Sequence, residues 1–170
     1  MEYTKLINDR YSCKKYADRP VEKEKLDAIF AAGRIAPTAK NLQEQHIYVL
    51  TTPEALAKVD ATSPCRYGAP VVLAVAYNKD DVYTYPGGLH SSGIEDATIV
   101  ATHLLLGAEN EGLNTCWINC FDPEALAKEL GLPANEEISM LLDVGYHAEG
   151  CTTSPNHGVR KDITDTVTYM

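Results

Sequence analysis

The chain has 170 residues, of which 45% are hydrophobic and 23% charged, a balance typical of globular proteins. Its 15 Lys and Arg against 24 Asp and Glu give a formal net charge of −9, which disfavours nucleic-acid binding because phosphate backbones repel an acidic surface. No apolar run approaches the roughly 20 residues of a membrane helix, so no membrane partner is expected. The N-terminus lacks the apolar stretch of a secretory signal. We therefore expect a single domain over residues 1–170, in the cytoplasm.

Helix and strand patterns alternate in the first half of the chain. In Glu22–Arg34 apolar residues repeat with the period of an α-helix and form one stripe. The run Val71–Tyr77 is β-branched and apolar throughout, which is typical of a buried strand. The other predicted segments are a helix at Tyr3–Asn8, a loop at Ile35–Glu44, a strand at His46–Leu50, a helix at Pro53–Asp60, and loops at Thr62–Gly68 and Asn78–Gly93.

The longest predicted helix, Ile94–Glu111, is apolar on most of its faces and must therefore be buried on most of them. A domain of this size struggles to enclose such a helix alone, so we infer that part of it contacts a second subunit. Gly112 is expected to end this helix. The remaining segments are a strand at Leu113–Cys120, a helix at Pro123–Leu130 capped by Asp122, a strand at Ile138–Tyr146, a loop at Cys151–Lys161 and an extended tail at Ile163–Tyr169. Helices mixed with about four strands predict an α+β or α/β layer fold.

The five cysteines are widely spaced, and with no export signal they indicate the reduced thiols of a cytosolic protein. Cys116 and Cys120 would share one face of a strand about 13 Å apart, too far for a disulfide or a shared zinc ion. No histidine pair has a metal-ligand spacing, so no metal site is predicted. We expect structural or incidental roles for the thiols, although Lys14 could lower the pKa of Cys13.

Two groups of cations stand out in this acidic chain. Arg10, Ser12 and Lys14 alternate, so an extended segment would direct all three side chains the same way. Arg can bind phosphate oxygens through two N–H groups, Ser can donate its hydroxyl and Lys supplies a point charge. The second group is Arg160–Lys161. Solvated surface cations are the alternative interpretation, and the absence of a G-x-G-x-x-G or P-loop motif argues against a nucleotide held on a glycine-rich turn.

A polar loop, Ala36–Gln43, is rich in short hydrogen-bonding side chains, which by themselves are also typical of a plain turn. Together with the segments around it, this loop resembles the nitroreductase family of FMN-dependent enzymes. The family motifs are R-x-S-x-[KR]-x-[FY], A-P-[ST]-x-x-N-x-Q and G-L-x-[ST]-x-W-[IV], and the matching segments here are Arg10–Tyr16 followed by Pro20 and Val21, Ala36–Gln43, Asp96, Gly112–Ile118, Val144–Tyr146 and Arg160–Lys161. The resemblance covers nearly the whole chain.

The resemblance implies a nitroreductase-like α+β sandwich, in which helices flank a central, mostly antiparallel sheet. It also implies an intertwined homodimer with FMN at the subunit interface. The Ile94–Glu111 helix, inferred above to meet a second subunit, agrees with this expectation. NADH or NADPH would act as a transient reductant, and the other partner would be a small-molecule acceptor.

The residues that would hold FMN also follow from the resemblance. Arg10 and the pair Arg160–Lys161 would bind the phosphate, Ser12 the phosphate or ribityl chain, and Tyr11 would contribute its backbone. Lys14 would lie near the N1–C2=O edge of the flavin, where a cation stabilises the anionic reduced ring. Further flavin contacts would come from Ser92, Gly93 and Ile94, which would pass a backbone N–H to N5, and from Pro37, Thr38, Ala39, Asn41 and Gln43 of the partner subunit.

Several positions depart from the family pattern. Glu44 and Gln45 follow Gln43 where relatives often carry Pro and Trp, and Lys40 stands where a small residue is common. Arg66 could replace a second Lys that some relatives place against the pyrimidine ring. The stretch Lys79–Ser91 is short, so the pocket should be open or lined by Tyr83 and Tyr85.

The predicted activity is a ping-pong oxidoreductase reaction in one shared pocket. NAD(P)H would reduce the flavin, and an electron-poor acceptor such as a nitroaromatic or a quinone would then take the electrons. No acid–base residue is required, and no G-x-S-x-G motif is present. The alternatives are a flavin-binding sensor or carrier on the same fold with little turnover, and a cysteine-based redox or metal protein.

Overall fold

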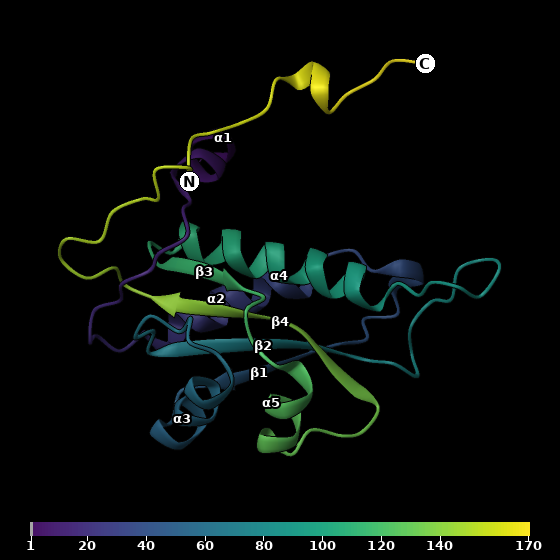
Figure 1. Cartoon of the computed structure of the whole chain (residues 1–170), viewed down its shortest axis with the longest axis horizontal. Helices are drawn as coiled ribbons and strands as arrows, with labels where there is room; N and C mark the ends of the chain where they lie inside the picture. Colours follow the sequence, from purple (N-terminus) through teal and green to yellow (C-terminus); the bar gives the residue numbers. More distant parts are fainter. Residues whose placement is uncertain (1) are drawn as a thin grey trace.

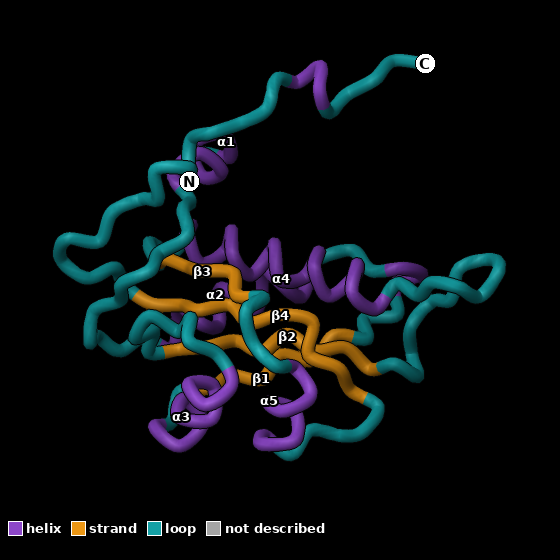
Figure 2. Tube along the Cα trace, viewed as in Figure 1, coloured by secondary structure: helices purple, strands orange, loops and turns teal. Residues whose placement is uncertain are grey.

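The computed structural model describes residues 2–170, in which a four-stranded sheet lies between two layers of helices (Figures 1 and 2). The helices are α1 (Tyr3–Asp9), α2 (Lys23–Arg34), α3 (Pro53–Thr62), α4 (Gly93–Asn110) and α5 (Pro123–Leu130). The strands are β1 (Gln45–Leu50), β2 (Val71–Asn78), β3 (Asn114–Ile118) and β4 (Glu136–Gly145), with short 3₁₀-helices η1 (Ala39–Asn41) and η2 (Ile163–Asp165). The predicted α+β architecture is confirmed.

The strands pair in the order β1-β2-β4-β3, and each neighbouring pair is antiparallel. In the centre of the sheet Leu73 of β2 lies opposite Val49 of β1 and Leu142 of β4. β2 is buried from Val71 to Tyr77 because both of its faces are covered, which explains its unbroken apolar sequence. The expectation of a mostly antiparallel central sheet is therefore confirmed.

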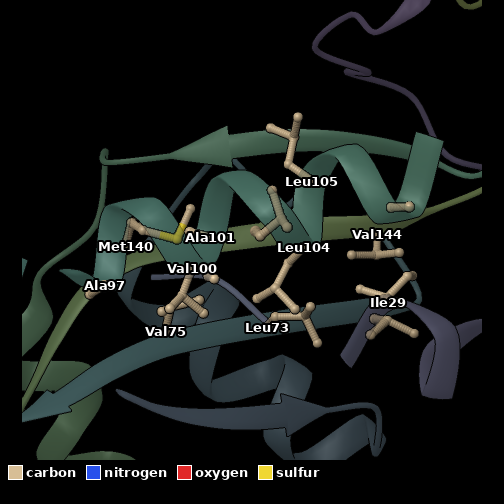
Figure 3. Packing of buried hydrophobic residues seen from close by; sticks show 14 of the residues in the cluster. Ile29, Leu73, Val75, Ala97, Val100, Ala101, Leu104, Leu105, Met140 and Val144 are labelled. Carbon is tan, nitrogen blue, oxygen red and sulfur yellow. The ribbon is translucent and has the colours of Figure 1, made fainter. Parts of the chain in front are cut away.

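The core has two halves, one on each face of the sheet. Alternate residues of β2, such as Leu73 and Val75, pack against α4 and α2, with Val100 and Leu104 pointing toward them in Figure 3. The intervening residues of β2 pack toward α3 and α5. Gly33 of α2 is required here, because a Cβ would lie 2.5 Å from the Leu104 side chain. Each fully buried aliphatic side chain contributes about 1.5–3 kcal/mol to folding.

The predicted helix ends are confirmed at α4 and α5. The Asp122 side chain accepts a hydrogen bond from the Ala125 N–H at 3.0 Å and so caps α5, which ends at Gly131 with φ 72°. Gly112 follows α4 with φ 72°, a conformation that glycine adopts without steric cost. The Leu113 N–H then donates to the Ala108 carbonyl at 2.9 Å, so the chain leaves α4 directly into β3.

Two predictions about secondary structure are wrong. β3 ends at Ile118, so Cys120 is not on a strand with Cys116; the chain turns there toward the cap of α5. The tail is not extended over Ile163–Tyr169, since η2 forms at its start. The Asp162 side chain accepts from the Thr164 N–H at 2.9 Å and favours this turn.

The last 23 residues, 148–170, are here named the C-terminal arm. The arm leaves the body of the protein and ends away from the sheet (Figure 1). It carries exposed apolar side chains, with Val159 at 68% and Ile163 at 72% exposure. On α4, Ile94 is 56% and Ile99 37% exposed, although eight other residues of the helix are buried. α4 therefore keeps uncovered apolar surface within one chain, as the sequence predicted. In residues 2–170 no helix is long and apolar enough to cross a membrane.

Candidate functional site

A cavity of about 400 Å³ lies along β3, between the segment that follows α1 and the C-terminal arm. Its lining combines a cation, hydroxyl and amide groups, aromatic rings and thiols. The lining residues are Ser12, Lys14, Cys65, Tyr67, Cys116, Trp117, Ile118, Asn119, Cys120, Ser154, Asn156 and His157. This volume and this mixture of apolar walls with a few polar groups are typical of small-molecule sites.

The segment after α1 is held against β3 by its backbone. The Cys13 N–H donates to the Thr115 carbonyl at 2.8 Å, and Ser12 forms a parallel bridge with Thr115. Cys13 is buried as a result, while Ser12 and Lys14 both line the cavity. The predicted alternation therefore brings Ser12 and Lys14 together.

Arg10 and Tyr11 lie outside that lining. Burial raises the pKa of Glu109, near the end of α4, and the Arg10 charge partly offsets this shift. The Tyr11 ring meets the His157 ring edge-on, with 6.5 Å between centroids. Tyr11 is thus in contact with the C-terminal arm, and the roles of both residues toward a phosphate stay predictions.

A smaller cavity of about 260 Å³ continues from the first along the sheet. Trp117 and Asn119 line both cavities, and the Trp117 Nε1–H donates to Asn119 Oδ1 at 2.8 Å. Ile94, at the start of α4, lines the second cavity. The two cavities, which share Trp117 and Asn119 in their walls and have Lys14 in the first and Ile94 in the second, are together named the β3 trough. It joins two predicted site segments that are 80 positions apart in the sequence.

Ser92 and Gly93 directly precede Ile94 but do not themselves line the β3 trough. The Ser92 hydroxyl is buried and accepts from the Tyr83 N–H at 3.2 Å. A Cβ on Gly93 would lie 2.3 Å from the Tyr77 ring, so glycine is required at this position by packing inside the chain. The family resemblance predicts a backbone N–H from this segment to flavin N5, and the packing against Tyr77 is a separate reason for glycine within the chain.

The loop at Ala36–Gln43 is fastened to the first turn of α4. The Ala39 N–H donates to Asp96 Oδ1 at 2.9 Å. Lys40, Asn41 and Gln43 have φ of 52°, 56° and 57°, a conformation uncommon for residues other than glycine and often found at functional sites. The predicted flavin contacts, which are Pro37, Thr38, Ala39, Asn41 and Gln43, do not line the β3 trough of their own subunit. This placement agrees with a contribution to the partner's site.

A buried pair of carboxyl groups under this loop was missed by sequence reasoning. Glu44 is 5% exposed and Asp96 3% exposed. Burial, followed by the contact with Asp96, raises the pKa of Glu44 to about 7. The only feature of the sequence that pointed to this pair was Glu44 itself, an acidic residue directly after Gln43, where relatives often carry proline.

The C-terminal arm contributes polar residues that the sequence analysis did not select. Ser154, Asn156 and His157 line the cavity. Arg160 donates to the His157 and Val159 carbonyls at 2.6 and 2.7 Å, and Lys161 is exposed. The predicted basic pair is therefore next to the trough but not in its wall within one subunit. The short polar run that contains Ser154 and Asn156 was the available signal.

Arg66 and the two loop tyrosines lie elsewhere. The Arg66 guanidinium donates to Asp60, with Nε 2.7 Å from Oδ1, and to the Ala69 carbonyl at 2.9 Å. It does not line the trough, so its contact with a flavin stays a prediction. Tyr83 lines a separate shallow cavity with Lys40, whose Nζ is 4.6 Å from the ring centroid, and Tyr85 donates to Glu95.

The sequence left open that Lys14 lowers the pKa of Cys13, and the structure contradicts this alternative. Cys13 is completely buried, and this burial raises its pKa to about 12. Lys14 is instead exposed to the cavity. Within residues 2–170 no group of three or more His, Cys, Asp or Glu side chains is arranged to hold a metal ion.

Comparison with known proteins gives a consistent result. The family model described as "Nitroreductase family" matches residues 7–64 and 57–146. A crystal structure of a nitroreductase family protein from Clostridium difficile 630 superposes with a TM-score of 0.93 at 34% identity, covering 99% of this chain and 98% of that one. An NADH dehydrogenase from Thermus thermophilus is 27% identical over 82% of this chain and 84% of its own length. An FMN reductase [NAD(P)H] from Bacillus subtilis is 28% identical over 91% of this chain and 69% of its own. This protein belongs to the nitroreductase family.

Proposed function

We propose that the protein is an FMN-dependent oxidoreductase that uses NADH or NADPH to reduce a small electron-poor acceptor. The observation that carries this proposal is the β3 trough, which has Ser12 and Lys14 at one end, Trp117 and Asn119 along its length and Ile94 at the other end. Names of relatives that include NADH dehydrogenase and FMN reductase support the same activity.

The side chains that line the β3 trough are chemically suited to binding FMN. When bound, FMN supplies a ring that accepts a hydride from NAD(P)H and passes the electrons to an acceptor. The Trp117 and Tyr67 rings and the Ile118 side chain offer apolar surface to such a ring. Lys14 offers a positive charge, which stabilises negative charge that builds up on the ring. Asn119 offers an amide to the polar ring edge.

The phosphate would be held where the segment after α1 meets the C-terminal arm. Ser12 already lines the trough there, and Arg10 precedes it by two positions in the chain. We assign Arg160 and Lys161 to the same phosphate because they follow directly on arm residues that line the cavity. Arg160 would exchange its bonds to the His157 and Val159 carbonyls for the charged phosphate, a stronger partner.

We assign a homodimer to the active form. The exposed apolar residues of α4 and of the arm need a partner surface, and a second copy provides one. The loop at Ala36–Gln43 would then reach the partner's trough. Free thiols throughout the chain suit a cytoplasmic location.

The acceptor would occupy the face of the ring that NAD(P)H leaves, in a ping-pong sequence. The trough is an open groove, and the proposed acceptors are flat, electron-poor molecules such as nitroaromatics or quinones. The protein positions the two reactants against one ring and needs no acid–base side chain of its own.

The decisive experiment is an absorbance spectrum of the purified protein, followed by steady-state oxidation of NADH and NADPH with a nitroaromatic and a quinone. We expect the bands of oxidised flavin, release of FMN on denaturation and acceptor-dependent turnover. Bound FMN without turnover would favour the flavin sensor or carrier instead. A protein that stays colourless when mixed with excess FMN would refute the proposal. Arg10→Ala should retain less FMN than the parent, whereas an exposed cation without a role would leave retention unchanged.

A further inference from the structure

Two cysteines at opposite ends of the chain meet beside the β3 trough. Cys13 and Cys151 are 138 positions apart, yet their sulfur atoms are 3.6 Å apart. This separation is van der Waals contact between two sulfurs, and a shift of about 1.5 Å would bring them to the bond length of a disulfide. Both are free thiols in this structure.

The backbone around the two thiols is fastened within one chain. The Cys13 N–H donates a hydrogen bond to the Thr115 carbonyl of β3. The Ala148 N–H donates to the Lys15 carbonyl at 2.9 Å, and Lys15 Nζ donates to the Glu149 carbonyl, also at 2.9 Å. These bonds hold the start of the C-terminal arm against the segment that carries Cys13. The sulfur contact is therefore part of the folded subunit and does not depend on how the rest of the arm is placed.

The two thiols differ in accessibility. Cys13 is completely buried, whereas Cys151 is half-buried and can be reached from solvent. Burial, together with the neighbouring Cys13 and Cys151 thiols, raises the pKa of the Tyr11 hydroxyl, so this side chain lies beside the thiol pair. Burial raises the pKa of Cys13 to about 12, which protects it from direct oxidation. Cys151 is thus the site of first attack, and Cys13 is the nearby thiol that can resolve the product.

We propose that Cys13 and Cys151 are a modification site at which peroxide forms an intrachain disulfide. Peroxide oxidises the Cys151 thiol to a sulfenic acid and is itself reduced, with release of one water. The Cys13 thiol, 3.6 Å away, then passes its proton to the sulfenic oxygen as its sulfur attacks the Cys151 sulfur, the S–O bond breaks and a second water leaves. In total two thiols lose two electrons and two protons, hydrogen peroxide becomes two water molecules, and one S–S bond forms.

The crosslink would join the two walls of the proposed phosphate site. Cys13 lies between Ser12 and Lys14, and Cys151 lies just before the arm residues Ser154 and Asn156 that line the cavity. Bridging them restricts the opening of the arm away from the segment after α1. We expect slower release of FMN from the oxidised protein. This consequence depends on the proposed function, whereas the disulfide itself does not.

A second thiol pair provides an internal comparison. Cys65 and Cys120 both line the cavity, and the neighbouring Cys65 thiol raises the pKa of Cys120. Cys120 is exposed, so it would react with the same oxidant. Cys120→Ser removes this competing pair and leaves Cys13 and Cys151 in place. Cys151→Ser is the matched loss variant; Cys13 is left unchanged because its complete burial makes a substitution there prone to disturb the fold.

The test treats the full-length Cys120→Ser protein with hydrogen peroxide, blocks remaining thiols by alkylation and maps non-reduced peptides by mass spectrometry. We expect a Cys13–Cys151 crosslinked peptide that dithiothreitol removes and that Cys120→Ser/Cys151→Ser lacks. Failure to find it, oxidation of Cys151 only to sulfinic acid, or a crosslink between two subunits on a non-reducing gel would overturn the proposal.

The effect on the proposed site is measured on the same samples. We expect the half-time of FMN release on dilution to lengthen at least threefold after oxidation of Cys120→Ser, and to stay unchanged in Cys120→Ser/Cys151→Ser. A crosslink with unchanged FMN release would refute the role of the disulfide in holding FMN. A crosslinked protein that binds no FMN in either redox state would instead refute the proposed function and leave the modification site standing.

Discussion

The Asp96 carboxylate links the loop at Ala36–Gln43 to α4, since its Oδ1 accepts the Ala39 N–H at 2.9 Å, and the second carboxyl group of the region, Glu44, is buried against it. Two carboxyl groups this close and this buried are stable only when one of them keeps its proton. The proton that Glu44 keeps therefore avoids a second buried negative charge beneath a loop whose backbone is already strained at Lys40, Asn41 and Gln43.

This arrangement predicts a stability that falls with rising pH. The pKa of Glu44 is raised from 4.5 to about 7, so the folded state binds a proton that the unfolded chain releases between these values. The stabilisation is complete below about pH 4.5 and is lost as the pH rises through 7, a change of up to about 3 kcal/mol. Glu44→Gln should reduce the decline in urea midpoint between pH 5 and pH 8. It should not abolish the decline, because burial also raises the pKa of Asp143 to about 8.

Glu129→Gln is the control for this experiment, since Glu129 is exposed on α5, across the sheet from Glu44. This control should keep the pH dependence of the parent. Equal slopes in Glu44→Gln and in the parent would contradict the assignment of the proton to the buried pair.

Lys14→Met should weaken FMN binding about tenfold or more. The substitution keeps the length of the side chain but removes the cation at the end of the β3 trough, and hydrogen bonds to charged groups contribute about 1.5–3 kcal/mol. Quenching of flavin fluorescence on titration measures the dissociation constant. Lys23→Met, in an exposed i,i+4 ion pair with Asp27 on α2, is the matched control and should bind FMN as the parent does. An unchanged constant in Lys14→Met would place the flavin away from this end of the trough.

Removal of most of the C-terminal arm should abolish FMN retention and dimer formation. A chain that stops before Thr152 lacks Ser154, Asn156 and the basic pair Arg160–Lys161, and it also lacks the exposed apolar residues of the arm. Light scattering and the ratio of flavin to protein absorbance measure the two losses. A second truncation after Lys161 keeps every arm residue assigned to FMN, so it should retain FMN. If both truncations retained FMN equally, the arm would have no part in the site.

Gly93→Ala should destabilise the protein by about 1–3 kcal/mol, since the new methyl group would overlap the Tyr77 ring in a packed core. Chemical denaturation of the apoprotein measures this loss without any contribution from FMN. Gly158→Ala is the control, because no atom lies within 4 Å of the position of its Cβ, and it should unfold at the parent's midpoint. If the Gly93→Ala apoprotein were as stable as the parent, packing against Tyr77 would not explain the glycine at this position, and a contact with the cofactor would be the remaining reason.

The sequence alone was enough to predict the layers of this protein and most of its helix ends. Hydrophobic periodicity is a local property, so the stripe on α2 and the continuous apolar run of β2 are visible without any partner. Caps are equally local: Asp122 and Gly131 mark α5 within a few residues of their bonding partners. The alternation that places Ser12 and Lys14 on one side also needs only a short extended backbone.

Only the tertiary structure decided which distant residues share the trough. Asn119 and His157 join Lys14 in one cavity because β3 and the arm pass the same segment, and no local pattern encodes that meeting. The raised pKa of Cys13 and of Glu44 comes from burial, which depends on the packing of several elements at once. The same holds for Gly93, whose missing side chain makes room for a ring that lies 16 positions earlier in the chain. Local periodicity predicts which face of a segment is buried, but long-range packing determines what that face meets.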